Sequence, residues 1–400
     1  MNTKEFWKNL VSFLIIAIVV GLLLYASIAY GPKSGEAVPL LPEDKLLREL
    51  EIQEPRIVGV APIEEGEFET LLLLSEDAPD LKLPADFTSS YTVTVIGEIS
   101  FIPPAEFDLS SEDLAADNLS TEEKVDVLWR EAGKHDWNLS PGETPVPPTP
   151  IPPTPEPVGK VFEMGSSGGT LQIGYCANTF WGKYDNPGHP LDGTILSSTN
   201  AHCMTDIKNT YVKIATEWMV PGLRKGGIYP DDLVGKPLYW FPVNPQPAFS
   251  YLYDSGTIAL NTTSQMKNTL PGIGRINCVK DVRSLPVGTI IEKFGPTSGW
   301  TRAKIIAQNV AITINSTAVT PLMHFVKQTM IEGIAKAYNQ PPDPAMLPGD
   351  SGSPWVYRSG NDICLVAQGF AGNSDGRFGV ISSIIDILKG LRIKLLFELF

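Results

Sequence analysis

A serine set among small residues is the first candidate for chemistry in this sequence. Ser351 lies within the stretch PGDSGSP, residues 348–354. Glycine permits backbone conformations that larger residues resist, so the N–H groups of Gly349 and Ser351 can converge on one point, as an oxyanion hole requires. Taken alone, the same stretch could also be an ordinary turn capped by Asp350.

Hydrolysis by a serine hydroxyl also needs a histidine that accepts its proton and a carboxylate that orients the imidazole. The chain has four histidines, and His202 is the candidate because it follows a β-type run that ends in small residues and precedes Cys203. The other three are His135 in an acidic region, His189 in a Gly-Pro turn, and His324 between two large apolar residues.

Asp254 is the candidate carboxylate. It opens the stretch DSGTIAL, residues 254–260, just ahead of an apolar strand that could bury it. A lone aspartate before a strand is usually only a turn residue, so Asp254 is the weakest of the three by itself. Its weight comes from its place between His202 and Ser351.

The three stretches resemble the histidine, aspartate and serine motifs of chymotrypsin-like serine proteases. Their order is that of this family and differs from the order in subtilisin and the α/β-hydrolases. The intervals of 52 and 97 residues suit a double barrel with its site between the halves. A fourth stretch, VGTIIEKFGPTSGWT at 287–301, is similar to the segment that begins the second barrel of bacterial members. The resemblance covers about residues 165–400.

The resemblance implies an all-β fold, a double β-barrel, and a serine endopeptidase that works through an acyl-enzyme intermediate. It implies that Ser351 is the nucleophile, His202 the general base and acid, and Asp254 the orienting carboxylate. Backbone donors of Gly349 and Ser351 would form the oxyanion hole. Protein or peptide is the expected substrate, and no cofactor is expected. The alternative is a protease-fold module that binds without catalysis.

Substrate preference is only weakly indicated. In trypsin-like enzymes an aspartate six residues before the nucleophile selects Arg or Lys, and an ungapped count reaches Ala345 here. Asp343 lies nearby and would change this if the loop were offset. The stretch from Leu365 onward resembles the strand on which the family lays its substrate backbone. The candidate lining residues on it are Ala367, Gln368 and Gly369.

All four cysteines follow residue 158: Cys176, Cys203, Cys278 and Cys364. An even number in an exported chain favours disulfides over a metal site, and neither CxxC nor HxxxH spacing occurs, so no metal is expected. Three pairings are possible. The family resemblance implies a bridge from Cys203 to Cys176, which leaves Cys278 with Cys364.

One motif is interpreted as a coincidence. Arg56-Ile57-Val58-Gly59 looks like the activation cleavage site of trypsin-type zymogens, whose new N-terminus pairs with the aspartate before the nucleophile. It lies 146 residues before His202, however, beyond an acidic region and a proline-rich stretch. Asp350 therefore needs another partner, which the sequence does not identify.

The elements that must position these residues are short β-type segments separated by Gly, Pro, Asn and Asp turns, a pattern typical of closed or nearly closed β architectures. They are expected at 170–175, 194–198, 211–215, 256–260, 289–294, 303–314, 355–357 and 363–368. In the last twenty residues the spacing of apolar residues changes from that of a strand to that of a helix. An apolar face predicts a terminal helix through Ile384, Ile387, Leu388, Leu391 and Leu395.

Four regions are expected along the chain: 1–30, an anchor or signal; 31–140, acidic and of unknown role; 141–158, a proline-rich linker; and 159–400, the protease domain. Residues 31–158 carry 8 Lys and Arg against 27 Asp and Glu. Nine of the seventeen residues at 141–157 are proline, which favours an extended spacer. Clustered basic surface is not indicated, so no nucleic-acid partner is expected. The acidic region could be a stalk, a small domain or a pro-segment.

The N-terminal apolar segment predicts export. Residues 10–30 contain no charge and are long enough to span a hydrocarbon core as a helix. Lys4 and Lys8 precede the segment, which places the N-terminus inside and the rest outside. A membrane-anchored protein with an extracytoplasmic protease domain is expected. A cleaved signal peptide and a secreted protein are the alternative, since Ser27 and Ala29 offer a small-x-small site.

Overall fold

The computed structural model describes residues 42–101 and 160–397, apart from short internal gaps. The gaps are 63–68, 85–86, 88–89, 171–173, 207–211, 214–216, 223–224, 242–249, 262–263, 315–322 and 336–341. The expected anchor at 10–30 and the proline-rich stretch at 141–158 lie outside the described residues. No helix within the described ranges is long and apolar enough to cross a membrane.

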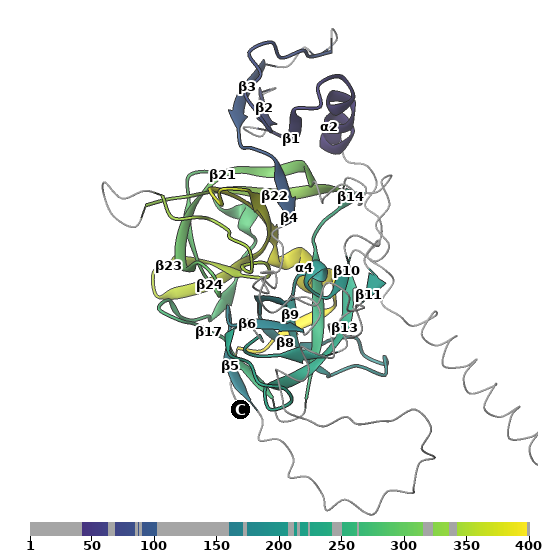
Figure 1. Cartoon of the computed structure of the whole chain (residues 1–400), viewed down its shortest axis with the longest axis vertical. Helices are drawn as coiled ribbons and strands as arrows, with labels where there is room; N and C mark the ends of the chain where they lie inside the picture. Colours follow the sequence, from purple (N-terminus) through teal and green to yellow (C-terminus); the bar gives the residue numbers. More distant parts are fainter. Residues whose placement is uncertain are drawn as a thin grey trace, which may run out of the picture.

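The second half of the chain forms a closed ring of six antiparallel strands, which Figure 1 shows in its upper part. Each strand pairs with two neighbours in the order β22, β25, β24, β23, β20, β21, and β21 pairs with β22 to close the ring. The strands are β20 (Ile290–Gly295), β21 (Gly299–Ile314), β22 (Met323–Gly333), β23 (Pro354–Ser359), β24 (Asp362–Asn373) and β25 (Phe378–Ser383).

Residues 167–260, called the first half below, form an eight-stranded antiparallel sheet together with the C-terminal strand β26. The strand order is β26, β8, β9, β15, β13, β12, β6, β7. Its strands are β6 (Ser167–Thr170), β7 (Gly174–Ala177), β8 (Trp181–Tyr184), β9 (Ile195–Thr199), β12 (Trp218–Met219), β13 (Leu233–Phe241), β15 (Ser255–Leu260) and β26 (Ile393–Leu395). The chain therefore has the predominantly β architecture that the sequence predicts.

Shorter strands pair outside these two units. They are β5 (Val161–Glu163) with β16 (Gln265–Lys267), β10 (Thr205–Asp206) with β11 (Val212–Lys213), β17 (Thr269–Leu270) with β18 (Gly274–Arg275), β14 (Ser250–Tyr251) with β22, and β19 (Cys278–Val279) with β24. The chain also forms two 3-10 turns, η1 (Ala201–Cys203), which follows β9, and η4 (Val282–Ser284).

Alternating burial along the ring strands explains why they form. In β20 the residues at 291, 293 and 295 are buried while those between them are more exposed. Because successive side chains of a strand point to opposite faces, one face of β20 lies against the core. Ile291, Ile305 and Trp355 are fully buried in the same apolar cluster there. Lys293 shares this inward face, which is unusual for a lysine.

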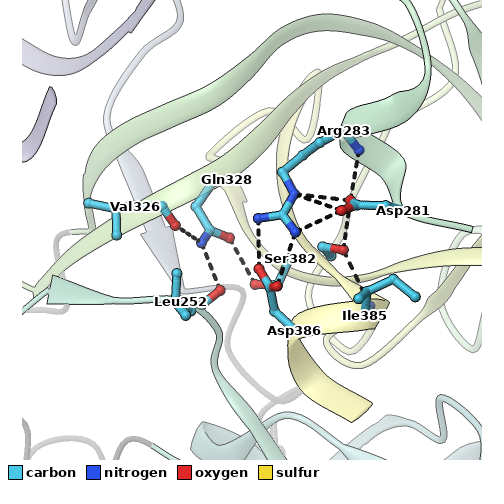
Figure 2. Close-up of polar contacts among 9 residues, drawn as sticks. Leu252, Asp281, Arg283, Val326, Gln328, Ser382, Ile385 and Asp386 are labelled. Atoms are coloured by element: carbon cyan, nitrogen blue, oxygen red, sulfur yellow. Dashed lines mark hydrogen bonds and ion pairs between the residues drawn. The ribbon is translucent and has the colours of Figure 1, made fainter. Parts of the chain in front are cut away.

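The terminal helix is shorter than expected. α4 (Ile384–Gly390) ends one turn early, and the chain then enters strand β26, so Leu395 belongs to a strand and not to the helix. Arg392, between them, has φ 54°, a left-handed conformation that interrupts the helical repeat. Figure 2 shows how Arg283 of η4 ties this helix down by an ion pair with Asp386 at 2.8 Å.

The acidic region contributes a folded part that joins the ring. α2 (Pro42–Gln53), β1 (Ile57–Pro62), β2 (Glu69–Leu74) and β3 (Ser90–Val95) lie together at the top of Figure 1. β1 pairs with β21, so the small sheet extends the sheet of the ring. Apolar side chains bury this contact, among them Leu50, Val60 and Val326. The sequence pattern did not predict this attachment.

A fourth strand of the acidic region, β4 (Ile99–Phe101), leaves the small sheet and reaches the ring. It pairs antiparallel with β24, with Phe101 opposite Ala371, Ser100 opposite Gly372 and Ile99 opposite Asn373. In Figure 1 it runs from the small sheet toward the ring. Residues 270 to 274 positions apart in sequence are thus partners in neighbouring strands.

Candidate active site

His202 and Asp254 are placed by two neighbouring strands of the first sheet. β9 and β15 run antiparallel, with Thr199 opposite Gly256. In such a pair the end of one strand lies beside the beginning of the other. His202 comes three residues after β9 ends, and Asp254 immediately precedes β15. A histidine just after one strand and an aspartate just before its antiparallel neighbour are therefore brought together.

The imidazole of His202 is held by Asp254 at two points. Nδ1 of the ring is hydrogen-bonded to Oδ2 of the carboxylate, and the backbone N–H of His202 donates to Oδ1 at 3.2 Å. Asn200 donates its amide to the backbone oxygen of Asp254 at 2.6 Å. Both side chains are buried. This fixes the ring with Nε2 on the side away from the carboxylate.

Ser351 completes the row from the second half of the chain. Nε2 of His202 lies 2.8 Å from Oγ of Ser351. The loop that carries Ser351 also touches the first sheet, because the N–H of Ala177 donates to the Ser351 carbonyl at 2.7 Å and Thr179 donates to the Gly352 carbonyl at 2.6 Å. The three sequence-predicted residues thus meet where the two halves adjoin.

Gly349 is required by the shape of this loop. It has φ 90°, a conformation that residues with a side chain rarely adopt. A Cβ added there would lie 2.6 Å from both Thr297 Oγ1 and the ring of Tyr175. The Oγ1 of Thr297 donates to the carbonyl of Pro348 at 2.7 Å and closes the loop from the other side. The predicted oxyanion residues therefore sit in a tightly fixed backbone.

Asp350 has Lys293 as its partner. Nζ of Lys293 donates to Oδ2 of Asp350 at 2.9 Å, and Oδ1 accepts from the backbone N–H of Thr297 and Ser298 at 3.1 and 3.2 Å. Burial alone would raise the pKa of Asp350, but the Lys293 charge and these hydrogen bonds hold it below its ordinary value. The carboxylate ties the Ser351 loop to the turn between β20 and β21.

The Arg56 to Gly59 stretch takes no part in this pairing. Arg56 is ion-paired with Glu54 at 2.6 Å and Asp80 at 2.9 Å. Ile57 and Gly59 lie in β1, where Gly59 is opposite Ile312 of β21. In this structure the stretch is a strand of the acidic region, and Asp350 is satisfied without it.

The cysteines form the two disulfides that the resemblance implies. Cys176 to Cys203 joins β7 to the turn next to His202, and Cys278 to Cys364 joins β19 to β24 in register. Cys176, His202 and Cys203 are the described residues whose donor atoms lie close enough for a metal. Both sulfurs are in a disulfide and both ring nitrogens are hydrogen-bonded, so this grouping does not offer a ligand set.

The predicted substrate-binding residues of β24 lie close to the Ser351 loop, but their backbone hydrogen-bonding groups are largely paired within the protein. The backbones of Ala367 and Gln368 pair with β23 on one side and β25 on the other. Gly369 exchanges backbone hydrogen bonds with Gly352 and Ser353. Ala345 is fully buried and adjoins Met346 in sequence. A Cβ on Gly369 would lie 2.6 Å from the sulfur of Met346.

Several solved protein structures are similar to part of this chain. The chain is similar in structure to bacterial chymotrypsin-like serine proteases. Protease A of Thermobifida fusca is 15% identical over 60% of this chain and 100% of that chain, with a TM-score of 0.37. The Nocardiopsis protease is 16% identical over 59% and 99%, with a TM-score of 0.38. The Cellulomonas bogoriensis chymotrypsin is 15% identical over 60% and 100%, with a TM-score of 0.37. No family model and no curated protein sequence matches.

Two buried polar residues beside the site were not predicted from the sequence. Lys293 lies within the stretch 287–301 but was not assigned a role. Gln328 of β22 donates to the carbonyl of Leu252, two residues before Asp254, at 2.9 Å and accepts from Ser382 at 2.8 Å, as Figure 2 shows. A lysine or glutamine at an inward strand position is the only signal, and it does not reveal the partner.

Proposed function

We propose that this chain is a serine endopeptidase in which His202, Asp254 and Ser351 act together. The observation that carries the proposal is the unbroken hydrogen-bonded row from Asp254 through both ring nitrogens of His202 to Ser351 Oγ. This is the geometry in which a histidine can take the serine proton while a carboxylate stabilises the imidazolium that forms. A protease-fold module without activity has no need of the complete row.

The reaction follows from this geometry. Nε2 of His202 accepts the proton of Ser351 as Oγ attacks the scissile carbonyl, and the N–H groups of Gly349 and Ser351 stabilise the oxyanion. The protonated His202 then gives the proton to the leaving amine, which leaves an acyl group on Ser351. Water, deprotonated by His202, hydrolyses the acyl-enzyme in the second half of the reaction. Asp254 holds the ring in place and stabilises the imidazolium that forms.

The proposed location is outside the cytoplasm. Two disulfides suit an oxidising compartment. The uncharged segment 10–30, with Lys4 and Lys8 before it, is proposed to anchor the chain in a membrane with the remainder outside. In the alternative, this segment is a cleaved signal and the protein is secreted. Protein or peptide chains are the proposed substrates in either case.

The test is labelling of Ser351 by a fluorophosphonate, which reacts with an activated serine. Prolonged exposure of the purified protein should label Ser351, and Ser351→Ala should abolish both labelling and peptide cleavage. Ser353→Ala is the matched control, because Ser353 is buried in the same loop and its hydroxyl makes no catalytic contact in the proposal. Full labelling of the Ser351→Ala protein would refute the assignment.

A further inference from the structure

The edge of β24 beside Ser351 is where an extended peptide would have to lie. β24 has two edges, and β25 pairs along one of them through Gly372. On the other edge β23 pairs as far as Gln368, and the Ser351 loop follows with the hydrogen bond from Gly352 to the Gly369 carbonyl. The next backbone groups on that edge belong to the residues from Ala371 onward. A peptide that adds a strand there is led to the nucleophile.

That stretch of edge is already occupied by β4 of the same chain. Ser100 lies opposite Gly372, and Phe101 lies opposite Ala371. Since the other edge of Ala371 and Gly372 is taken by β25, β4 must share the edge that β23 uses. β23, the Ser351 loop and β4 therefore follow one another along one side of β24.

The direction of β4 is also that of an approach to the nucleophile. Because β4 is antiparallel to β24, its chain advances from Asn373 toward Ala371, and so toward Gly369 and the Ser351 loop. In this arrangement Ser351 is fully buried and His202 is 1% exposed. The reacting atoms are therefore closed to solvent in the structure in which β4 is paired with β24.

Several contacts anchor β4 to this edge. Ile96 and Ile99 are buried in the main apolar cluster. The Asn373 amide donates to the carbonyl of Ile96 at 3.0 Å. Gly97, with φ 81°, makes the turn that brings the chain from β3 onto β24. The small sheet of β1, β2 and β3 is held to the ring through the pairing of β1 with β21, so β4 is presented at the edge by a folded support.

We propose that β4 is a built-in blocking strand that occupies the peptide-binding edge of β24 at Ala371 to Asn373. The proposal rests on the proposed protease function, for which it names the backbone-binding edge and its regulation. The ligand class of this edge is an extended polypeptide, and the acidic region supplies one in cis. The substrate-binding prediction for Ala367 and Gln368 moves accordingly a few residues along the strand. Activity requires that β4 leave.

The test compares Ser100→Pro with Ser100→Ala in the otherwise complete protein. Proline lacks the N–H and resists strand pairing, whereas alanine keeps both backbone groups. Ser100 is suited to the change because it is only half-buried, unlike Ile99. A tethered segment competes at an effective concentration of about millimolar, so Ser100→Pro should raise kcat/KM for peptide substrates about tenfold or more. Ser100→Ala should stay close to the parent.

Labelling separates this proposal from the function on which it rests. If neither the parent nor Ser100→Pro is labelled at Ser351, the protease function itself fails. If both are labelled and cleave peptides at equal rates, the blocking strand is overturned and the protease function stands. Faster labelling and cleavage by Ser100→Pro supports both.

A peptide added in trans tests whether the Ser100→Pro protein is still folded at the edge of β24. The synthetic peptide GEISFIPP, residues 97–104, should inhibit the Ser100→Pro protein, and a scrambled peptide of the same composition should not. Inhibition must be competitive with a peptide substrate, because both would pair with the same edge. Equal effects of the two peptides would contradict binding at this edge.

Discussion

Lys293 and Asp350 form an ion pair at 2.9 Å in which both side chains are fully buried. The lysine lies on the inward face of β20, and the aspartate directly precedes Ser351. Removing one member of a buried pair leaves an uncompensated charge, which typically costs about 3–5 kcal/mol. The pair therefore links the stability of the second half to the shape of the Ser351 loop.

Lys293→Met should lower the free energy of unfolding by about 3–5 kcal/mol and disturb the loop that carries Gly349 and Ser351. Urea denaturation followed by tryptophan fluorescence measures this loss. The double variant Lys293→Met, Asp350→Asn is the control, since it removes both charges and should lose less stability than the single variant. A single variant as stable as the parent would contradict a structural role for the pair.

Asp254→Asn should lower kcat by roughly four orders of magnitude while leaving the fold intact. The amide has the shape of the carboxylate, but it favours the wrong tautomer of His202 and does not stabilise the imidazolium. Steady-state kinetics with a peptide substrate and a thermal melt measure the two effects separately. A loss of less than tenfold, or a large drop in melting temperature, would assign Asp254 a mainly structural role.

Glu51 should make docking of the acidic region depend on pH. Burial raises its pKa from 4.5 to about 7, although the Thr313 hydrogen bond and the Arg48 charge act in the opposite direction. Facing groups are His324, whose pKa burial lowers to about 4, and Asp44, which is ion-paired with Arg48. The docked state thus holds the Glu51 proton more tightly than the undocked state. The contribution of Glu51 to docking is largest below about pH 4.5 and is lost as the pH rises through about 7, a loss of up to about 3 kcal/mol. The lowered pKa of His324 acts in the opposite direction and favours docking as the pH rises from about 4 to 6.5.

Hydrogen exchange of the α2 amides at pH 5.5 and pH 8 measures this dependence. Exchange should be faster at pH 8 in the parent, beyond the intrinsic effect of pH on exchange chemistry. Glu51→Gln keeps a neutral side chain at both pH values and should remove this additional exchange at pH 8. If Glu51→Gln shows the same excess as the parent, another group is responsible.

The sequence predicted the strands best where the pattern is local. The strand after Asp254, the serine loop and the run after residue 299 all carry their signal within a few residues. The helix through Leu395 was wrong beyond Gly390, because an apolar repeat of 3.6 and the alternation of a strand agree over so short a stretch. Local pattern does not choose between them.

Contacts between distant parts of the chain could not be predicted. In the sequence, Lys293 is one residue of the stretch 287–301. Only the closed ring places it beside Asp350. The pairing of β4 with β24 depends on a turn at Gly97 and on an edge left open by β23 more than 250 residues later. The prediction that Ala367, Gln368 and Gly369 line the substrate cleft likewise rests on the sequence of β24 alone, whereas the edge of a strand is defined by its neighbouring strands.

The strand β26 has a consequence for biosynthesis. It pairs with β8, so Gly182 lies opposite Leu395. A ribosome that makes the chain from its N-terminus has produced more than 200 further residues before β8 meets this partner. The half that carries His202 and Asp254 therefore cannot be finished during early translation or translocation. The sheet of that half is complete only after residue 395 has emerged.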